Sequence, residues 1–298
     1  MVHFGSLITA MITPFNEDGE INWKEVDRII EKLIADKSDS ILVSGTTGEA
    51  PTLSIEEKLA LFERAKKLVG GRAKIIAGTT NYCTKESIEL TKEAEKIGVD
   101  GILATAPYYN KPPQDGLYLH FAKIASETNL PIIIYNIPSR TAVNIQPETL
   151  KRLAADCPNI VGVKEASGDV NQISNIRRLL PRPFLLYSGD DSMTLPLLSI
   201  GGDGIISVAS HIVGKEIKEM IESFFKGDIA KASELHLKLL PIFRGLFVTT
   251  NPIPLKEALK LLGYNVGKCR LPLSPIDAKS RDELIKILKE YGFEINEG

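Results

Sequence analysis

The sequence predicts a (β/α)8 barrel with a C-terminal helical extension. Short apolar runs rich in β-branched residues recur along the chain, and amphipathic helical patterns separate them. Each run is compact enough to be a strand buried on both faces, as strands of parallel sheets are. No composition break or Pro/Gly/Ser-rich linker interrupts the alternation over residues 1–225. A closed parallel barrel is therefore favoured over an open doubly wound sheet, which is the alternative.

The expected elements follow one another in strict order. Eight strands are expected over residues 6–12, 40–44, 74–78, 101–105, 131–135, 160–164, 183–188 and 203–208. The helix expected over residues 24–35 carries its apolar residues on one face. Asn22, Ser54 and Ser280 each stand three residues before a glutamate, which is the spacing of an N-terminal capping pair.

The alternation stops after the eighth expected strand. Only helices are expected beyond it, over residues 214–225, 229–240, 254–262 and 281–291. The predicted organisation is therefore a barrel over residues 1–225, which carries the active site, and a C-terminal helical region over residues 226–298.

Composition and charge exclude several classes of protein. The 298 residues have a formal net charge of -2 with both signs interspersed, so no nucleic-acid partner is expected. Cys83, Cys157 and Cys269 form no C-x-x-C pair, which argues against a disulfide framework or zinc site and favours a cytoplasmic location. The apolar N-terminal segment reaches Pro14 too soon to span a membrane. The four histidines lack metal-ligand spacing, so no metal is expected.

Lys164 is the most informative single residue. It directly follows the apolar run Ile-Val-Gly-Val and so belongs to a strand that is otherwise free of charge. Most lysines are solvated surface groups, but that interpretation fails for a barrel strand that is covered on both faces. Burial lowers the pKa of an amine by disfavouring the ammonium form, which makes the amine nucleophilic near neutral pH. Active sites of such barrels lie at the C-terminal ends of the strands, where Lys164 is expected.

Three further features lie at the same ends of their expected strands. Tyr135 ends the preceding strand at a depth comparable to Lys164, where its phenol could carry a proton; the alternative is a core tyrosine. Arg140 lies in the turn that follows, where a guanidinium suits a substrate carboxylate; the alternative is a solvated arginine. The turn Gly45-Thr46-Thr47-Gly48 offers backbone N–H groups and two hydroxyls to a small carboxylate.

Several segments together resemble the dihydrodipicolinate synthase family, almost from end to end of the chain. They are GSLITAMITPF, GTTGEA, PYYN, YNIPSRT, GVKEASGD, SGDD, GGDGIISV, NPIPLKEAL and RLPL. The wider superfamily shares the barrel and the lysine, and includes N-acetylneuraminate lyase and the 2-keto-3-deoxy sugar acid aldolases. The resemblance implies a lyase of the class I aldolase type that condenses pyruvate with L-aspartate 4-semialdehyde, in the diaminopimelate route to lysine.

The resemblance implies catalytic roles for four residues. Lys164 would form the Schiff base with pyruvate, and Tyr135 would donate and accept the proton. Thr46 and Tyr109 would complete a proton relay, with Tyr109 reaching into the site of a neighbouring subunit. The family is commonly a tetramer built as a pair of dimers, so a homo-oligomer of at least two chains is expected.

The resemblance also implies substrate contacts. Thr47 and Ile206 would contact pyruvate through the backbone, and Gly189 would line the pocket. Arg140 would hold the carboxylate of aspartate semialdehyde, and this arginine is typically absent from the sugar acid aldolases and the neuraminate lyase. No cofactor is expected, because the Schiff base on Lys164 supplies the electron sink.

Departures from the family concern feedback by lysine. Family members that lysine inhibits use a serine, two histidines, an asparagine, a glutamate and a tyrosine near the dimer interface. The positions aligned with them here are Ala50, Ile55, Lys58, Tyr82, Glu86 and Tyr108, of which only the last two are kept. A cation at Lys58 would also lie near the inhibitor's ammonium group, so weak or absent feedback by lysine is expected.

Two alternative functions stay open at this point. A pyruvate-forming sugar acid aldolase or lyase would keep Lys164 and change the second substrate, and Arg140 argues against it. A non-catalytic barrel that binds a keto acid would form no covalent adduct with pyruvate.

Overall fold

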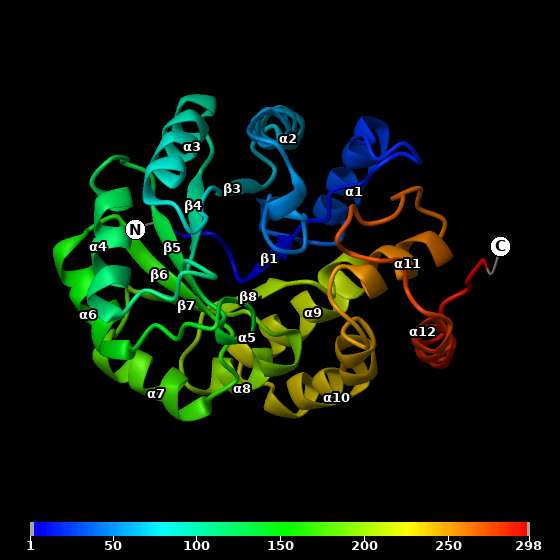
Figure 1. Cartoon of the computed structure of the whole chain (residues 1–298). Helices are drawn as coiled ribbons and strands as arrows, with labels where there is room; N and C mark the ends of the chain where they lie inside the picture. The colour runs from blue at the N-terminus through cyan, green and yellow to red at the C-terminus, as the bar shows by residue number, and fades with distance from the viewer. Residues whose placement is uncertain (1–2, 297–298) are drawn as a thin grey trace.

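The predicted closed barrel is confirmed. A computed structural model describes residues 3–296, in which eight parallel strands close in sequential order and β1 pairs with both β2 and β8 (Figure 1). The strands are β1 (Leu7–Ala10), β2 (Ser40–Val43), β3 (Lys74–Gly78), β4 (Gly101–Thr105), β5 (Ile132–Asn136), β6 (Ile160–Glu165), β7 (Leu185–Ser188) and β8 (Gly204–Ser207). The strands predicted over residues 74–78 and 101–105 are confirmed at both ends, as are the predicted starts at residues 40 and 160 and the predicted end at residue 188, and the remaining ends differ by one or two residues.

Helices surround the barrel and follow its strands. They are α1 (Trp23–Ala35), α2 (Ile55–Val69), α3 (Thr84–Ile97), α4 (Gln114–Ala125), α5 (Pro138–Thr141), α6 (Pro147–Asp156), α7 (Val170–Leu179), α8 (Thr194–Ser199), α9 (Ser210–Phe225), α10 (Ile229–Gly245), α11 (Ile253–Leu261) and α12 (Ala278–Tyr291). Short 3-10 helices cover Ala50–Thr52 and Asp191–Met193.

Alternation along the strands divides the core into two layers. Residues such as Ile8, Leu42, Ile76 and Ile206 belong to a compact inner cluster that fills the barrel. Their neighbours in sequence belong to a larger cluster between the strands and the helices. Both layers are closed to solvent, so a charged residue that points inward needs a special reason to be there.

The capping predictions are confirmed for two helices and wrong for the third. The Asn22 side chain accepts the Glu25 N–H at the start of α1, and Ser54 and Glu57 form a reciprocal capping box on α2. At α12 the cap is Asp277, whose carboxylate accepts the Ser280 N–H, so the helix starts earlier than predicted. Asp277 displaces Ser280 from that role because a carboxylate is a strong acceptor for free N–H groups at a helix start.

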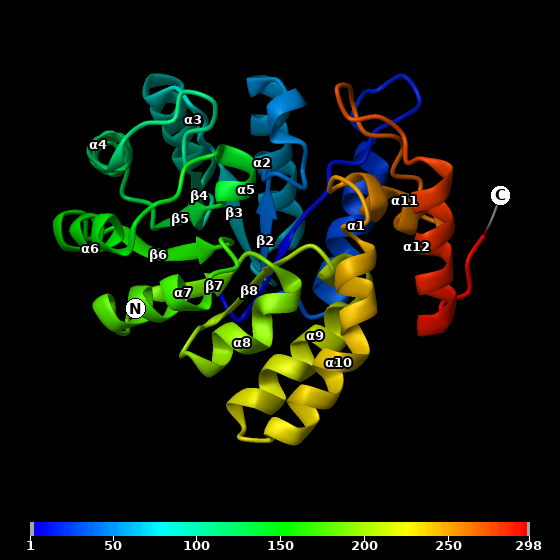
Figure 2. The ribbon, with the colours of Figure 1, turned by 60° about the horizontal axis from the view of Figure 1, so that its bottom comes forward.

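The C-terminal helices lie against one side of the barrel. Figures 1 and 2 show α11 and α12 beside α1 and α10, and the Arg28 side chain of α1 donates to the Gly263 carbonyl after α11. Helix α10 runs past its predicted end at Leu240 to Gly245, because burial of Ile242 and Phe243 outweighs the N–H that Pro241 lacks. The division between a barrel and a helical region at residue 225 stays a prediction.

No helix within residues 3–296 is both long and apolar enough to cross a membrane.

Candidate active site

A cavity of about 470 Å³ lies at the C-terminal mouth of the barrel, where an active site was predicted. Residues that follow β2, β3, β4 and β5 line it, which brings together segments far apart in the sequence. Among its lining residues are Ser44, Thr46, Thr80, Ile137 and Arg140. Within residues 3–296, the buried Ser44 hydroxyl has no hydrogen-bond partner, so it is available to a ligand in this cavity.

Lys164 is buried near the end of β6, as predicted. Its relative exposure is 5%, and the strand register pairs it with Tyr135 on one side and Tyr187 on the other. The Nζ atom lies 4.2 Å from the centroid of the Tyr135 ring. Burial lowers the pKa of Lys164 to about 7; the Asp191 carboxylate opposes this shift and the Arg140 guanidinium adds to it. The amine is therefore partly uncharged at neutral pH, as a nucleophile must be.

Gly189 follows β7, the strand beside β6, and directly adjoins the lysine. A Cβ atom at Gly189 would lie 3.1 Å from the Lys164 Cε atom and 2.7 Å from the Ala166 Cβ atom. Only glycine leaves this space to the lysine side chain. Ile206 lies in β8 and belongs to the inner cluster of the barrel. Gly189 thus borders the Lys164 side chain and Ile206 lies inside the barrel, and the pyruvate contacts that the family resemblance implies for both residues stay predictions.

Tyr135 keeps its proton at neutral pH. The side chain is buried, which raises the pKa of its phenol well above the ordinary value, and hydrogen bonding with the Thr46 side chain opposes this shift. Thr46 comes from the turn after β2, so the pair joins two strands that are not neighbours in the barrel. A protonated phenol near a threonine hydroxyl is a suitable proton carrier beside an amine.

Thr47 and Arg140 meet at Asn251, a residue in the C-terminal region. The Asn251 Nδ2 atom donates to the Thr47 Oγ1 atom at 3.0 Å, and the Arg140 Nη2 atom donates to the Asn251 carbonyl at 3.3 Å. Arg140 is exposed at the mouth of the cavity, whereas Thr47 is buried. The sequence did not predict a role for Asn251; its place in the motif NPIPLKEAL was the only signal.

Asp191 is a second residue that the sequence reasoning missed. Its buried carboxylate accepts the Ser207 hydroxyl at 2.5 Å and the Val208 and Ala209 N–H groups at 3.1 Å each. Burial raises the pKa of Asp191 to about 6, while these hydrogen bonds lower it. The negative charge of Asp191 favours the charged form of Lys164. The same charge therefore favours a cationic nitrogen in a Schiff base at this position.

Glu165, next to Lys164, points into a network of neutral donors. The Asn136 Nδ2 atom donates to both of its carboxylate oxygens, at 3.1 and 3.0 Å, and the Gln172 Nε2 atom donates at 3.1 Å. The Ser167 N–H donates at 2.7 Å. These four hydrogen bonds compensate a buried carboxylate and hold the end of β6 rigid.

Tyr109 is not brought to the other predicted site residues within one chain. Its side chain is 90% exposed, and its backbone has φ +73°, in the left-handed region that non-glycine residues seldom adopt. The neighbouring Tyr108 packs edge-on against Tyr82, with ring centroids 5.3 Å apart, and lines the cavity instead. An exposed tyrosine in a strained conformation is a group that another chain could receive.

Four of the six positions aligned with a lysine-inhibitor site lie around the same cavity. Ala50, Lys58, Tyr82 and Tyr108 line it, and burial lowers the pKa of Lys58. Glu86 accepts a hydrogen bond from the Asn81 side chain at 2.7 Å and opposes the Lys58 shift.

The absence of a metal stays a prediction. Among residues 3–296, no group of three or more His, Cys, Asp or Glu side chains is arranged to hold a metal ion. His211 is fully buried, contacts the Ile12 N–H and the Val208 carbonyl, and has a pKa lowered to about 4 by burial. It is a neutral core histidine.

The barrel, the buried amine with a lowered pKa and the adjoining phenol define a lyase of the class I aldolase type, which acts through a Schiff base. Residues 3–291 match the dihydrodipicolinate synthetase family, and the chain belongs to that family. A relative from Desulforamulus reducens, named 4-hydroxy-tetrahydrodipicolinate synthase, is 53% identical over 96% of this chain and 97% of its own.

Solved structures agree with this assignment. A dihydrodipicolinate synthase from Aquifex aeolicus has a TM-score of 0.96 and 44% identity, over 98% of this chain and 100% of that one. A DHDPS from Cyanidioschyzon merolae with lysine bound has a TM-score of 0.95 and 47% identity, over 97% of this chain and 98% of that one. The family predicted from the sequence motifs is therefore confirmed.

Proposed function

We propose that this chain is a 4-hydroxy-tetrahydrodipicolinate synthase, which condenses pyruvate with L-aspartate 4-semialdehyde. The observation that carries the proposal is the Lys164 amine, with a pKa of about 7, held 4.2 Å from the Tyr135 ring. The name that the relative from Desulforamulus reducens bears supports the same activity, since it is 53% identical along 96% of this chain.

The first step forms a carbon–nitrogen bond. The uncharged Lys164 amine adds to the pyruvate carbonyl, and the resulting carbinolamine loses its oxygen as water to give an iminium ion. Tyr135, with Thr46 as its hydroxyl partner, carries the proton that leaves the nitrogen and reaches the departing oxygen. Asp191 favours the cationic iminium through its nearby negative charge.

The second step forms the carbon–carbon bond. The iminium withdraws electrons, so a proton leaves the pyruvate methyl group and an enamine results. The enamine carbon attacks the aldehyde of aspartate semialdehyde, whose oxygen takes a proton. The amino group of that substrate then displaces Lys164 by transimination, which closes the ring and restores the free amine. Proton and electron balance need no cofactor, because the iminium itself is the electron sink.

Arg140 selects the second substrate in this proposal. It lies exposed at the cavity mouth, where its guanidinium can bind the carboxylate of aspartate semialdehyde. Its contact with the Asn251 carbonyl restrains the side chain before substrate arrives. Thr47, Gly189 and Ile206 form the pyruvate end of the site in the same proposal.

Three accompanying predictions belong to this proposal. The active form is a homo-oligomer, a tetramer built from two dimers, in which Tyr109 of one chain completes the site of another. Feedback by lysine is weak or absent. The enzyme works in the cytoplasm.

One assay separates the possible functions. The purified chain should form a borohydride-trapped adduct with pyruvate on Lys164 and should consume aspartate semialdehyde in a coupled assay. A sugar acid aldolase would trap pyruvate and leave aspartate semialdehyde unchanged. A chain that traps no pyruvate on Lys164 would contradict the proposal altogether.

A further inference from the structure

The turn that carries Thr46 and Thr47 has an unusual backbone. Ser44 and Glu49, which flank it, both have φ +57°, in the left-handed region, although neither is glycine. Such conformations are unfavourable for residues with a Cβ atom and persist only where the surroundings impose them. Some other part of the chain must therefore hold this turn in shape.

The Glu49 carboxylate is the point where the turn is held. Its side chain is buried, with a relative exposure of 0%, and the Lys256 Nζ atom lies 2.5 Å from its Oε1 atom. The Arg270 backbone N–H donates to the Oε2 atom at 2.8 Å. Both partners belong to the C-terminal region, about 200 residues further along the chain. Lys256 also donates to the Lys268 carbonyl at 3.2 Å.

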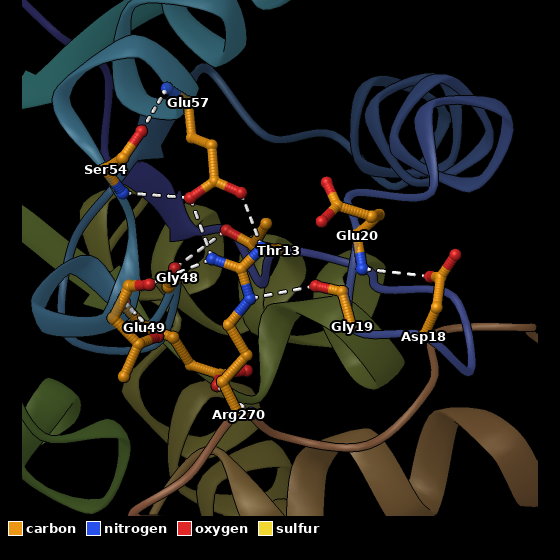
Figure 3. Close-up of polar contacts among 10 residues, drawn as sticks. Thr13, Asp18, Gly19, Glu20, Gly48, Glu49, Ser54, Glu57 and Arg270 are labelled. Atoms are coloured by element: carbon orange, nitrogen blue, oxygen red, sulfur yellow. Dashed lines mark hydrogen bonds and ion pairs between the residues drawn. The ribbon is translucent and has the colours of Figure 1, made fainter.

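The Arg270 side chain also links the C-terminal region to the barrel (Figure 3). Its guanidinium donates to the Gly19 carbonyl at 2.9 Å, to the Thr52 carbonyl at 2.9 Å and to both Glu57 carboxylate oxygens, at 2.8 and 2.5 Å. Glu57 in turn forms the capping box of α2 with Ser54. Arg270 thus binds the segment after β1, the end of the turn and the start of α2 at once.

The segment that follows β1 also packs against the turn. The Thr13 Oγ1 atom donates to the Gly48 carbonyl at 2.7 Å, and Figure 3 shows this contact beside Glu49 and Arg270. A Cβ atom at Gly48 would lie 3.0 Å from the Met11 carbonyl oxygen, so the turn packs directly on this segment. The turn is restrained both by this segment and by the C-terminal region, and within residues 3–296 its ionic restraint is the pair between Glu49 and Lys256.

We infer that Glu49 is a positioning residue for the proposed reaction, and that Lys256 and Arg270 fix Thr46 and Thr47 in place through it. The inference rests on the proposed function, in which Thr46 is the hydroxyl partner of Tyr135. Asn251 contacts Thr47 from the same region, so the C-terminal region is part of the catalytic unit. None of the three charged side chains needs to touch substrate.

Stability alone is the competing explanation, because removal of one member of a buried ion pair leaves a charge without compensation. The double variant E49Q/K256M distinguishes the two explanations, since it removes both charges and keeps the approximate side-chain volumes. We expect it to fold, to keep its unfolding midpoint near that of the wild type, and to lose about tenfold or more in kcat, with a higher KM for pyruvate. A purely stabilising pair would leave both kinetic constants unchanged in this variant.

R270A gives a second arm with a matched control, because the Arg270 side chain anchors the backbone whose N–H binds Glu49. The Arg270–Glu57 pair and the Arg177–Asp203 pair are partly buried to similar degrees, but Asp203 precedes β8 at the far end of the barrel. R270A and R177A should therefore lower the unfolding midpoint similarly, while only R270A lowers kcat, by about threefold to tenfold. The single variant K256R keeps the cation that E49Q/K256M removes. Its kcat should therefore stay within about threefold of the wild type.

The results separate this inference from the proposed function. A wild-type chain that fails to trap pyruvate contradicts the proposed function. A crystal structure of E49Q/K256M tests the positioning without any activity: the inference predicts a displaced turn over residues 44–50. An undisturbed turn, or R270A kinetics equal to those of R177A, would overturn the inference.

Discussion

Lys164 and Tyr135 are partners in the register of adjacent strands, and the lysine nitrogen lies 4.2 Å from the centre of the tyrosine ring. The register between β5 and β6 shifts between Ile132 and Ile133, which pairs Ile133 with Gly162 and so Tyr135 with Lys164. Gly162 has no room for a side chain, since a Cβ atom would lie 2.7 Å from Leu185. This local irregularity sets the amine beside the phenol.

The lowered pKa of Lys164 predicts the pH dependence of imine formation. With a pKa of about 7, the uncharged amine is a minor species at pH 6 and the major one at pH 8. Borohydride trapping of pyruvate should rise by about tenfold between these values and level off above them. An amine with an ordinary pKa would show a continued rise up to pH 10, and that result would contradict a buried nucleophile.

Burial of the Lys164 amine should also lower the free energy of unfolding of the protein. The folded-state pKa of Lys164 lies below its unfolded value, so the ammonium form is penalised on folding and stability falls as pH decreases through the range between the two. K164M should abolish turnover and raise the free energy of unfolding at pH 7 by roughly 2 kcal/mol. Denaturant titration of the wild type and K164M at pH 7 measures this, and a less stable K164M would contradict it.

Arg140 should act mainly on the second substrate, with a smaller effect on Lys164, whose pKa its charge helps to lower. R140A should lower kcat/KM for aspartate semialdehyde by roughly 10- to 100-fold, the effect of losing a charge-assisted hydrogen bond. At pH 9, where Lys164 is mostly uncharged with or without Arg140, the KM for pyruvate should stay unchanged within about twofold. R178A, an exposed arginine near the end of α7, is the matched control and should change neither constant. An equal effect of R140A on both substrates would argue against carboxylate binding.

Tyr109 should work across a subunit boundary. Y109F and K164M should each be nearly inactive alone, but mixed oligomers should recover roughly a quarter of wild-type activity, because half of the pairs are hybrids and one of two sites in each is intact. The exposed, strained Tyr109 motivates this test. Mixtures no more active than the sum of their components would place Tyr109 outside the neighbouring site.

His211 should make folding sensitive to mild acid. Its pKa is lowered to about 4 in the fold, against an ordinary value of 6.5, so the unfolded chain binds the proton more readily. Stability from this residue is complete above pH 7 and is lost as pH falls toward 4. Between pH 7 and pH 5 the wild type should lose about 2 kcal/mol more than H211Q. Equal losses in urea titrations of both chains would contradict this.

Several site residues could be predicted because each carries a local signal. Lys164 stands in an expected strand that is otherwise free of charge. Tyr135 lies at the end of the preceding expected strand, and Arg140 lies in the turn that follows it. Asn251 and Asp191 could not be predicted in this way. Asn251 donates a hydrogen bond to Thr47, which lies more than 200 positions away, and Asp191 accepts one from Ser207 in β8. No periodicity in the sequence predicts either contact.

The same distinction holds for the elements. The caps at Asn22 and Ser54 could be predicted because each depends on two residues three positions apart. At α12 the same spacing was misleading, because Asp277 and not Ser280 caps the helix. Helix α10 continues beyond Pro241 because its apolar face is buried against other helices. Local helix propensity does not include such burial.

The sequence alone determined the barrel and the family and singled out Lys164 as the candidate amine, because strand periodicity and short motifs are local properties of the chain. Only the tertiary structure decided the register that sets Tyr135 beside Lys164, the burial that lowers the lysine pKa, and the ion pair between Glu49 and Lys256. These depend on residues distant in sequence, because desolvation and charge pairing arise only when the whole chain has closed around them.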